Sequence, residues 1–378
     1  MFLRTSARLR WIIYAPSLAA ALAVSAFGQS ADSAAAPPPV IVGGFIDAYF
    51  NFNFDRPTSH VNQFRNFDVA ENQFVLSMAE VSVTKAPSPV GFRVDADFGP
   101  TNDLVQGGLP GSLANIGQAY ITYVAPMGAG LTIDVGKFVT HMGFEVIKAK
   151  DDYNYSRSLL FALSIPYNHI GLRASYPVSD KLTLMGCIHN NLTGLPTVNS
   201  GKSFGFAAIF TPMSTLSIIA NWLGGPDRPD TGITASKKWR NVGELIVSYS
   251  PTPKLTVAVD WVYGQQTPET VSGPLGLELW RGVAGYVRYA ICDPSILTLR
   301  GELYDDPAGF TTSTGTPQRI YEGTFTYEYK GLSNLILRAE YRYDWTQDHM
   351  LSNLYDGDTG HSTRWNQATF AIGAIVVF

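Results

Sequence analysis

Only two cysteines, Cys187 and Cys292, occur among the 378 residues of the chain. Because they fall on separate predicted strands, we expect two free thiols and no disulfide framework. Charge is also scarce: charged residues make up 15% of the chain and the net charge is −4, which argues against binding of nucleic acid. Past the amino-terminal region there is no run of about 18 apolar residues, so the sequence predicts no transmembrane helix.

The sequence offers little for catalysis or metal binding. No two histidines have the His-x-x-x-His spacing of a helical metal site, and no spacing of serine, histidine and carboxylate singles out a catalytic triad. We therefore predict no catalytic residue, no metal ligand and no cofactor, and expect a protein that is not an enzyme.

The amino terminus has the pattern of an export signal. An arginine-rich start precedes an apolar stretch, residues 11–27, which ends in small residues. This order predicts a secretory signal peptide over residues 1–28, since the apolar stretch is short for a membrane span. Residues 29–41 are rich in alanine and proline. We expect them to form a flexible periplasmic linker, too short for a plug domain.

The stretch at residues 365–378 alternates with a period of two. Counting back from Phe378, every second side chain as far as Ala368 is apolar, Phe370 among them, and the intervening positions are small or more polar. This pattern predicts a strand with one apolar face. A strand of this kind ending in Phe is typical of the closing strand of a bacterial outer-membrane β-barrel, where the barrel-assembly machinery is thought to recognise it. The alternative is the last strand of a soluble β-sheet protein.

The whole of residues 42–378 repeats this pattern as about sixteen strands, with short Pro-, Gly- or Asp-containing turns alternating with long polar loops. The fold predicted is all-β: a transmembrane up-and-down antiparallel β-barrel with both termini in the periplasm. Its apolar faces should point outward, because a barrel of this size encloses a channel and not a packed core. Six tryptophans near strand ends on the long-loop side are expected to form an outer aromatic girdle: Trp222, Trp239, Trp261, Trp280, Trp345 and Trp365.

The third long loop, residues 140–165, carries the most specific motifs. It contains Gly-x-Glu at 143–145 and Asn-Tyr-Ser-Arg-Ser at 154–158, and Pro-x-x-His-x-Gly-x-Arg follows at 166–173. In this order the block resembles the OmpL-like putative β-barrel porin family of Gram-negative bacteria, and the similarity runs from about Gly43 to Phe378. The resemblance implies an outer-membrane channel but supplies neither a substrate nor catalytic residues.

Charges on this loop and on the barrel wall are the candidate functional residues. We expect the loop to fold into the lumen, so that its acids face wall residues across a water-filled gap and set up a transverse field. The alternative is that these charges are simply solvated in a wet lumen. The loop candidates are Glu145, Asp151, Asp152 and Arg157, and the wall candidates are Arg93, Asp95, His169, Arg173, Arg300, Arg338, Glu340 and Arg342.

The function predicted is a porin for passive diffusion of small hydrophilic solutes or ions. A substrate-specific channel is the main alternative, and an outer-membrane lipid hydrolase is a lesser one. The expected partners are outer-membrane lipid, the permeating solutes and, by analogy with sixteen-stranded general porins, two further copies in a homotrimer. Nucleic acid is not expected.

Overall fold

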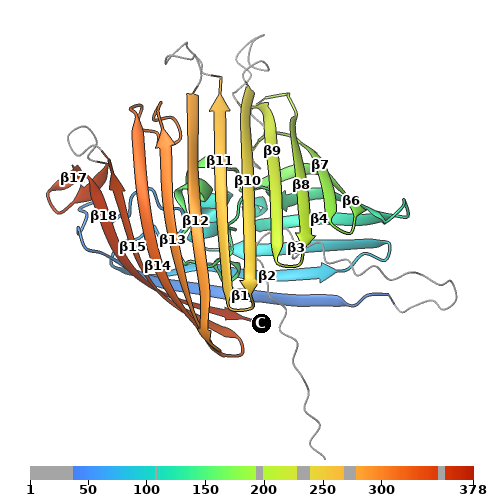
Figure 1. Cartoon of the computed structure of the whole chain (residues 1–378), viewed down its shortest axis with the longest axis horizontal. Coiled ribbons are helices and arrows are strands. Elements are labelled where there is room, and N and C mark those ends of the chain that lie inside the picture. Colours follow the sequence, from blue (N-terminus) through green and yellow to red (C-terminus); the bar gives the residue numbers. More distant parts are fainter. Residues whose placement is uncertain are drawn as a thin grey trace, which may run out of the picture.

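A closed antiparallel barrel dominates the computed structural model, which describes residues 37–106, 109, 111–192, 199–227, 239–267, 278–347 and 354–378 (Figure 1). The predicted signal peptide, residues 1–28, lies outside the described residues. Each barrel strand pairs with its neighbour in sequence, and β1 pairs with β18 to close the sheet, with Phe45 opposite Val377. This up-and-down order confirms the predicted fold class.

Sixteen strands form the barrel in the described part of the chain, as the sequence predicts. They are β1 (Val40–Asn53), β2 (Gln73–Lys85), β3 (Val90–Phe98), β4 (Ile116–Ala125), β5 (Leu131–Val139), β6 (Asn168–Ser179), β7 (Leu182–His189), β8 (Ser203–Met213), β9 (Leu216–Pro226), β10 (Trp239–Thr252), β11 (Leu255–Gln266), β12 (Glu278–Cys292), β13 (Ser295–Asp306), β14 (Gln318–Leu332), β15 (Leu335–Thr346) and β18 (Asn366–Val377).

The long loops contain short elements that the sequence pattern does not predict. They are α1 (Pro100–Val105), α2 (Leu159–Ser164), the 3₁₀ turns η2 (Gly111–Asn115) and η3 (Ala149–Asp151), and the hairpin of β16 (Tyr355–Gly357) and β17 (Gly360–Arg364). Among the described helices, none is long and apolar enough to cross a membrane.

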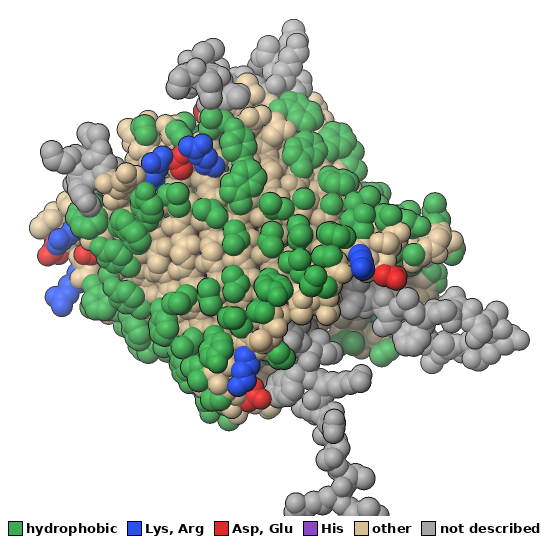
Figure 2. Space-filling model, in the orientation of Figure 1, with side chains coloured by type: hydrophobic (Ala, Val, Ile, Leu, Met, Phe, Trp, Pro, Cys, Tyr) green, Lys and Arg blue, Asp and Glu red, His purple; other side chains and the backbone are tan. Residues whose placement is uncertain are grey.

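Side-chain alternation along each strand separates an apolar outer surface from a polar interior. On β15, Leu337 points outward and is 38% exposed, whereas its neighbour Arg338 points inward and is 2% exposed. Figure 2 shows the result on one face: a broad apolar surface, with the few charged side chains near its edges. This is the inverse of a soluble sheet and is the arrangement that lipid requires.

The predicted tryptophan girdle is correct in part. Trp222, Trp239 and Trp261 are exposed on the outer surface, and Trp345 stacks on Tyr321 with ring centroids 5.4 Å apart. The prediction is wrong for Trp280, which is buried. Its position in the period of two places it inward, on the same face as Tyr286. Glycine at the facing position on β11, Gly264, leaves room for it, since a Cβ there would lie 2.0 Å from the indole ring.

Candidate functional site

The loop between β5 and β6, residues 140–167 and called L3 below, lies inside the barrel. Its apolar side chains are almost fully buried: Phe144, Tyr155 and Leu160 are 2%, 3% and 1% exposed. Phe144 packs on the inward-facing Tyr286 of β12 with ring centroids 4.5 Å apart, and the Tyr155 hydroxyl donates to Asp47 of β1 at 2.9 Å. These contacts lie on opposite sides of the closing seam of the barrel, so L3 is held against a wide arc of the wall.

Three carboxylates of the wall accept hydrogen bonds from backbone N–H groups of L3. Two of them each hold a pair of consecutive N–H groups, and the third receives one N–H on both of its oxygens. Irregular loop backbone and the first turn of a helix, here α2, leave such N–H groups without a backbone partner, and burying them unpaired would be costly. The contacts join Gly143 to Glu244 (2.9 Å), Tyr155 and Ser156 to Glu340 (2.6 and 2.9 Å), and Leu159 and Leu160 to Glu302 (2.7 and 2.6 Å).

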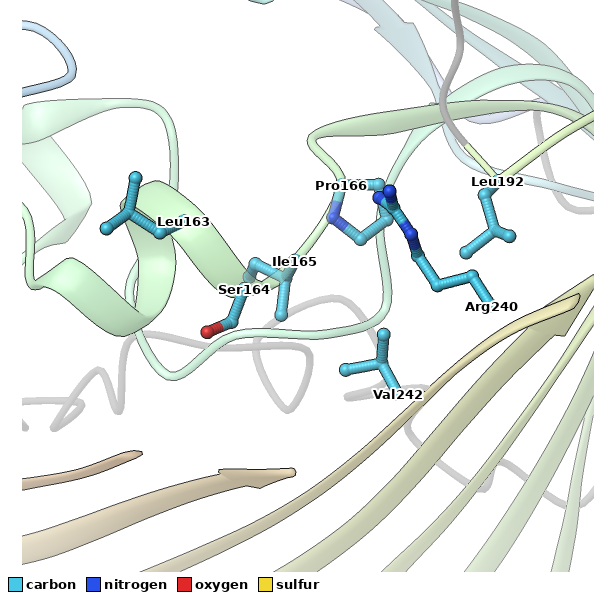
Figure 3. A pocket seen from close by; sticks show the side chains of 7 residues that line it. All are labelled: Leu163, Ser164, Ile165, Pro166, Leu192, Arg240 and Val242. Carbon is cyan, nitrogen blue, oxygen red and sulfur yellow. The ribbon is translucent and has the colours of Figure 1, made fainter. Parts of the chain in front are cut away.

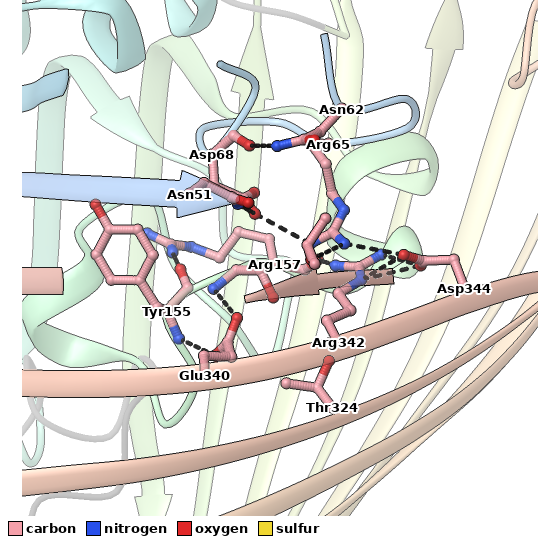
Figure 4. Close-up of polar contacts among 12 residues, drawn as sticks. Asn51, Asn62, Arg65, Asp68, Tyr155, Arg157, Thr324, Glu340, Arg342 and Asp344 are labelled. Atoms are coloured by element: carbon pink, nitrogen blue, oxygen red, sulfur yellow. Dashed lines mark hydrogen bonds and ion pairs between the residues drawn. The ribbon is translucent and has the colours of Figure 1, made fainter. Parts of the chain in front are cut away.

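Three wall arginines complete the attachment by donating to backbone carbonyls of L3. Each of them is also paired with an acid of the wall, so its charge is compensated where it is buried. Arg300 binds the Ser156 carbonyl at 2.8 Å and Glu322 at 2.9 Å. Arg338 binds Glu328 and the carbonyls of Ala149, Asp152 and Asn154. Arg342 binds Asp344 and the Arg157 carbonyl. Figure 4 shows the Glu340 and Arg342 contacts.

The acids of L3 itself are placed differently from one another. Glu145 is buried and forms an ion pair with Arg300, with 2.7 Å between Oε1 and Nη1. Asp152 is buried and forms an ion pair with Arg157 at 2.8 Å. Asp151 has a side chain that is 47% exposed and pairs with Lys150 at 2.7 Å. Glu145 and Asp152 therefore hold the loop together by direct contact and do not face the wall across water.

A second loop packs against L3. Residues 54–72, called L1 below, bring Arg65 into a buried network with Asp68 and Asp344, both at 3.0 Å (Figure 4). The guanidinium of Arg157 lies over the ring of Phe67, with Cζ 5.0 Å from the ring centroid. Phe67 also packs on Phe161. Neither residue belongs to a periodic stretch, so no pattern in the sequence singles them out.

The remaining wall candidates lie on β3 and β6. Arg93 pairs with Asp95 at 2.9 Å, and Asp95 also receives Lys148 of L3 at 2.7 Å. Arg173 pairs with Asp134 at 2.8 Å and is not in contact with an acid of L3. These charges are thus compensated in small local groups.

His169 belongs to a cluster of imidazoles behind the start of L3. Its ring stacks on that of His189 with centroids 4.0 Å apart, and its Nε2 lies 3.1 Å from the Thr140 hydroxyl. His189 Nε2 lies 2.9 Å from Cys187 Sγ, and His141 is 4.0 Å from the same sulfur. Within the described ranges, no group of three or more His, Cys, Asp or Glu residues is arranged to hold a metal ion.

One serine motif has the spacing of a hydrolase nucleophile but not its geometry. Residues 201–205 read Gly-Lys-Ser-Phe-Gly. In hydrolases that carry this motif the serine sits on a tight turn between a strand and a helix. Here Ser203 is the first residue of β8, is fully buried and pairs in register with His189. The local structure is an ordinary barrel strand, so the motif does not form a nucleophile turn.

The two phenylalanines of the closing strand lie at the seam. Phe370 faces outward opposite Phe52 of β1. Phe378 exchanges two backbone hydrogen bonds with Gly44, each 3.0 Å long. A side chain at Gly44 would collide with the Phe378 ring, since the Cβ would lie 2.6 Å from it.

A small cavity of about 60 Å³ lies between the end of L3 and β10. Figure 3 shows Leu163, Ser164 and Ile165 on one side of it, and Arg240 and Val242 of β10 on the other. Its volume matches about two water molecules at their share in the liquid. It is a gap in the loop packing, too small for an organic solute.

Sequence reasoning missed two of the wall carboxylates that hold L3. Glu244 and Glu302 lie on strands whose period of two places them inward, and this phase could have identified them. It could not have identified their partners, because the backbone path of L3 is not periodic.

Comparison with known proteins gives a consistent result. A family model described as "Putative beta-barrel porin-2, OmpL-like" matches residues 39–378. None of the curated proteins compared with the sequence matches it. Three solved structures are similar over nearly the whole chain, at sequence identities that show the fold alone.

The first of these is the trimer form of OmpT, an outer membrane protein of Vibrio cholerae: TM-score 0.59, 13% identity, 91% of this chain and 100% of that chain. The second is an anion-selective porin from Comamonas acidovorans: TM-score 0.61, 9% identity, 90% and 99%. The third is the outer membrane channel DcaP of Acinetobacter baumannii: TM-score 0.56, 12% identity, 93% and 100%.

Proposed function

The chain belongs to the OmpL-like putative beta-barrel porin family and is an integral outer-membrane channel; on this premise we propose that L3 narrows the channel and that small hydrophilic solutes or ions cross it by passive diffusion. The observation that carries the proposal is the attachment of L3 to the wall through both its N–H and its carbonyl groups. A loop held this way occupies the lumen permanently, because each of its buried contacts would have to break before it could leave.

The use of the charged residues around L3 supports passive diffusion. Several charged groups of L3 and of the wall, Glu145, Arg300 and Arg338 among them, hold the loop, and the cavity of about 60 Å³ beside it is too small for an organic substrate. That cavity therefore gives no support for a substrate-specific channel. A lipid hydrolase would need an accessible nucleophile, and Ser203 is buried within a barrel strand. We therefore favour a channel without enzymatic activity.

The route to the membrane and the assembly follow from the same premise. Residues 1–28 direct export, the barrel-assembly machinery inserts the chain through its closing strand β18, and outer-membrane lipid surrounds the apolar outer surface. The resemblance in fold to the trimer form of the Vibrio cholerae protein supports a homotrimer.

Conductance in planar bilayers tests this function. The purified protein should give discrete, ohmic steps in potassium chloride. A variant that lacks residues 147–153 loses the carbonyl acceptors of Arg338 at Ala149 and Asp152, and its steps should be larger. Heat-modifiable migration on a gel shows that this variant still forms a barrel. Absence of any conductance would contradict the channel, and unchanged steps in the shortened variant would place the narrowest point elsewhere.

A further inference from the structure

One carboxylate in the lumen serves three cations. Glu328 of β14 accepts from Arg338 at 2.6 Å, from Lys330 at 3.0 Å and from Arg288 of β12 at 3.1 Å. Arg288 and Lys330 share the same oxygen, Oε1. Arg338 also lies near the carboxylates of Asp152 and Glu340, whereas Arg288 and Lys330 share one acid, so the group carries a surplus of positive charge at these two residues.

The two cations on Oε1 face water. Arg338 is buried against L3, but the side chains of Arg288 and Lys330 are 23% and 40% exposed. Arg288 lies over the ring of Tyr153 of L3, 5.0 Å from its centroid, which places it next to the loop. Both residues lie close to the ends of strands that lead into short turns, and short turns of such barrels are periplasmic. The two cations thus line the lumen on the periplasmic side of L3.

Other cations close to L3 are compensated. Three sets of them, on the loop or on the inner wall, are each paired with an equal number of carboxylates. These sets are Arg173 with Asp134, Lys150 with Asp151, and Arg93 and Lys148 with Asp95 and Glu80. The wall acids that hold L3 are buried beneath loop N–H groups.

We propose that Arg288 and Lys330 form a binding site for small anions that carry a carboxylate or phosphate group, and that this site gives the pore a preference for anions. The inference rests on the proposed channel function and names its solute class. A guanidinium offers two parallel N–H donors to such an oxyanion, and an ammonium adds a point charge. Fixed cations beside a narrow, water-filled passage raise the local concentration of anions and lower that of cations.

Reversal potentials across a potassium chloride gradient test the site. The native protein should show an anion-selective reversal potential. The double variant Arg288→Gln/Lys330→Gln should move this potential towards the value for a non-selective pore, while Arg288→Lys, which keeps the charge, should not. The matched control is Arg281→Gln/Arg319→Gln, which removes two cations that are 58% and 46% exposed on the outer face around Asp305 and should leave the potential unchanged.

Citrate, added from the periplasmic side, provides a second measurement in the same recordings. It should block the native current transiently, and the double variant should need a several-fold higher citrate concentration for the same block. A pore whose reversal potential and citrate block are the same in native protein and double variant would overturn the anion site and leave the channel function standing. A native protein without any conductance would overturn the channel function itself, and the site with it.

Discussion

Arg300 of β13 and Glu145 of L3 form a buried ion pair in which Nη1 and Oε1 are 2.7 Å apart. Their side chains are 0% and 3% exposed. The same guanidinium binds Glu322 of β14 at 2.9 Å and the Ser156 carbonyl at 2.8 Å. One side chain therefore ties two parts of L3 to two strands. Such a pair is weak evidence for stability as a whole, but removal of one partner leaves a buried charge without compensation.

Replacing Arg300 with methionine should loosen L3. Glu145 would be left buried without its cation and Glu322 would keep Arg342 at 3.7 Å, at a cost of about 3–5 kcal/mol for a broken buried pair. We expect noisier and larger single-channel currents, together with a lower urea concentration at the midpoint of unfolding. Arg281→Met serves as control, since Arg281 lies on the outer face and its side chain is 58% exposed. If both variants behave alike, Arg300 does not hold the loop.

Neighbouring residues on β15 should respond in two different ways. Leu337 faces lipid, and an arginine in its place should lower the yield of folded barrel. The free energy of folding should fall by about 2–4 kcal/mol if the position lies at the bilayer midplane. Arg338 faces inward and holds three L3 carbonyls, so Arg338→Leu should fold but conduct differently from the native protein. Heat-modifiability after refolding in detergent measures the first effect and bilayer recording the second. Equal folding yields for Leu337→Arg and Arg338→Leu would show that the faces of β15 are reversed.

The sequence was sufficient for β15 because a barrel strand has only one degree of freedom that matters, the phase of its alternation. Once Leu337 faces lipid, Arg338, Glu340 and Arg342 must face inward, and the structure agrees. The same phase places Trp280 inward, although its position near a strand end suggests the outer girdle.

The loops followed no such rule. The sequence identified L3 by its length and motifs, but the meeting of Glu340 with the N–H groups of Tyr155 and Ser156 depends on a backbone path that has no period. The same holds for two buried residues of L1, Arg65 and Phe67. Arg65 has a local partner in Asp68, but the contacts that join the two residues to the rest of the barrel, Arg65 with Asp344 and Phe67 with Phe161, are with distant parts of the sequence, which a local pattern does not contain.

Removing the Phe67 side chain should uncouple L1 from L3. Phe67 is buried against Phe161 and Arg157, and deletion of a buried aromatic ring costs about 3–5 kcal/mol. Once L1 moves, Arg65, which is 7% exposed, becomes accessible. We therefore expect trypsin to cleave after Arg65 in folded Phe67→Ala but not in the native barrel. Phe54→Ala is the control, because Phe54 is 54% exposed on the outer surface; cleavage at equal rates in both variants would contradict this packing role.

Acid should weaken the docking of L3 through His141. The imidazole is buried at the start of the loop, and its Nε2 lies 3.2 Å from the Trp222 carbonyl, which can only accept, so the neutral form donates from Nε2. Burial lowers the pKa of His141 from 6.5 to about 3, the Trp222 carbonyl acts in the opposite direction, and His189 and Arg173 lower it further.

Because the pKa of His141 is lower in the docked loop than in the free loop, protonation of His141 favours the free loop. Docking should therefore be fully favourable above about pH 6.5 and should weaken as the pH falls from there towards 3. In His141→Gln the amide can still donate to the Trp222 carbonyl but has no proton to take up. In bilayer recordings, conductance should rise as the pH falls over this range, and the rise should be steeper in the native protein than in the variant. Groups that are not in contact with His141 are the same in both proteins, so the difference between the two curves reports on His141 and on the neighbouring imidazoles of His169 and His189. Curves of identical slope would exclude a contribution from His141.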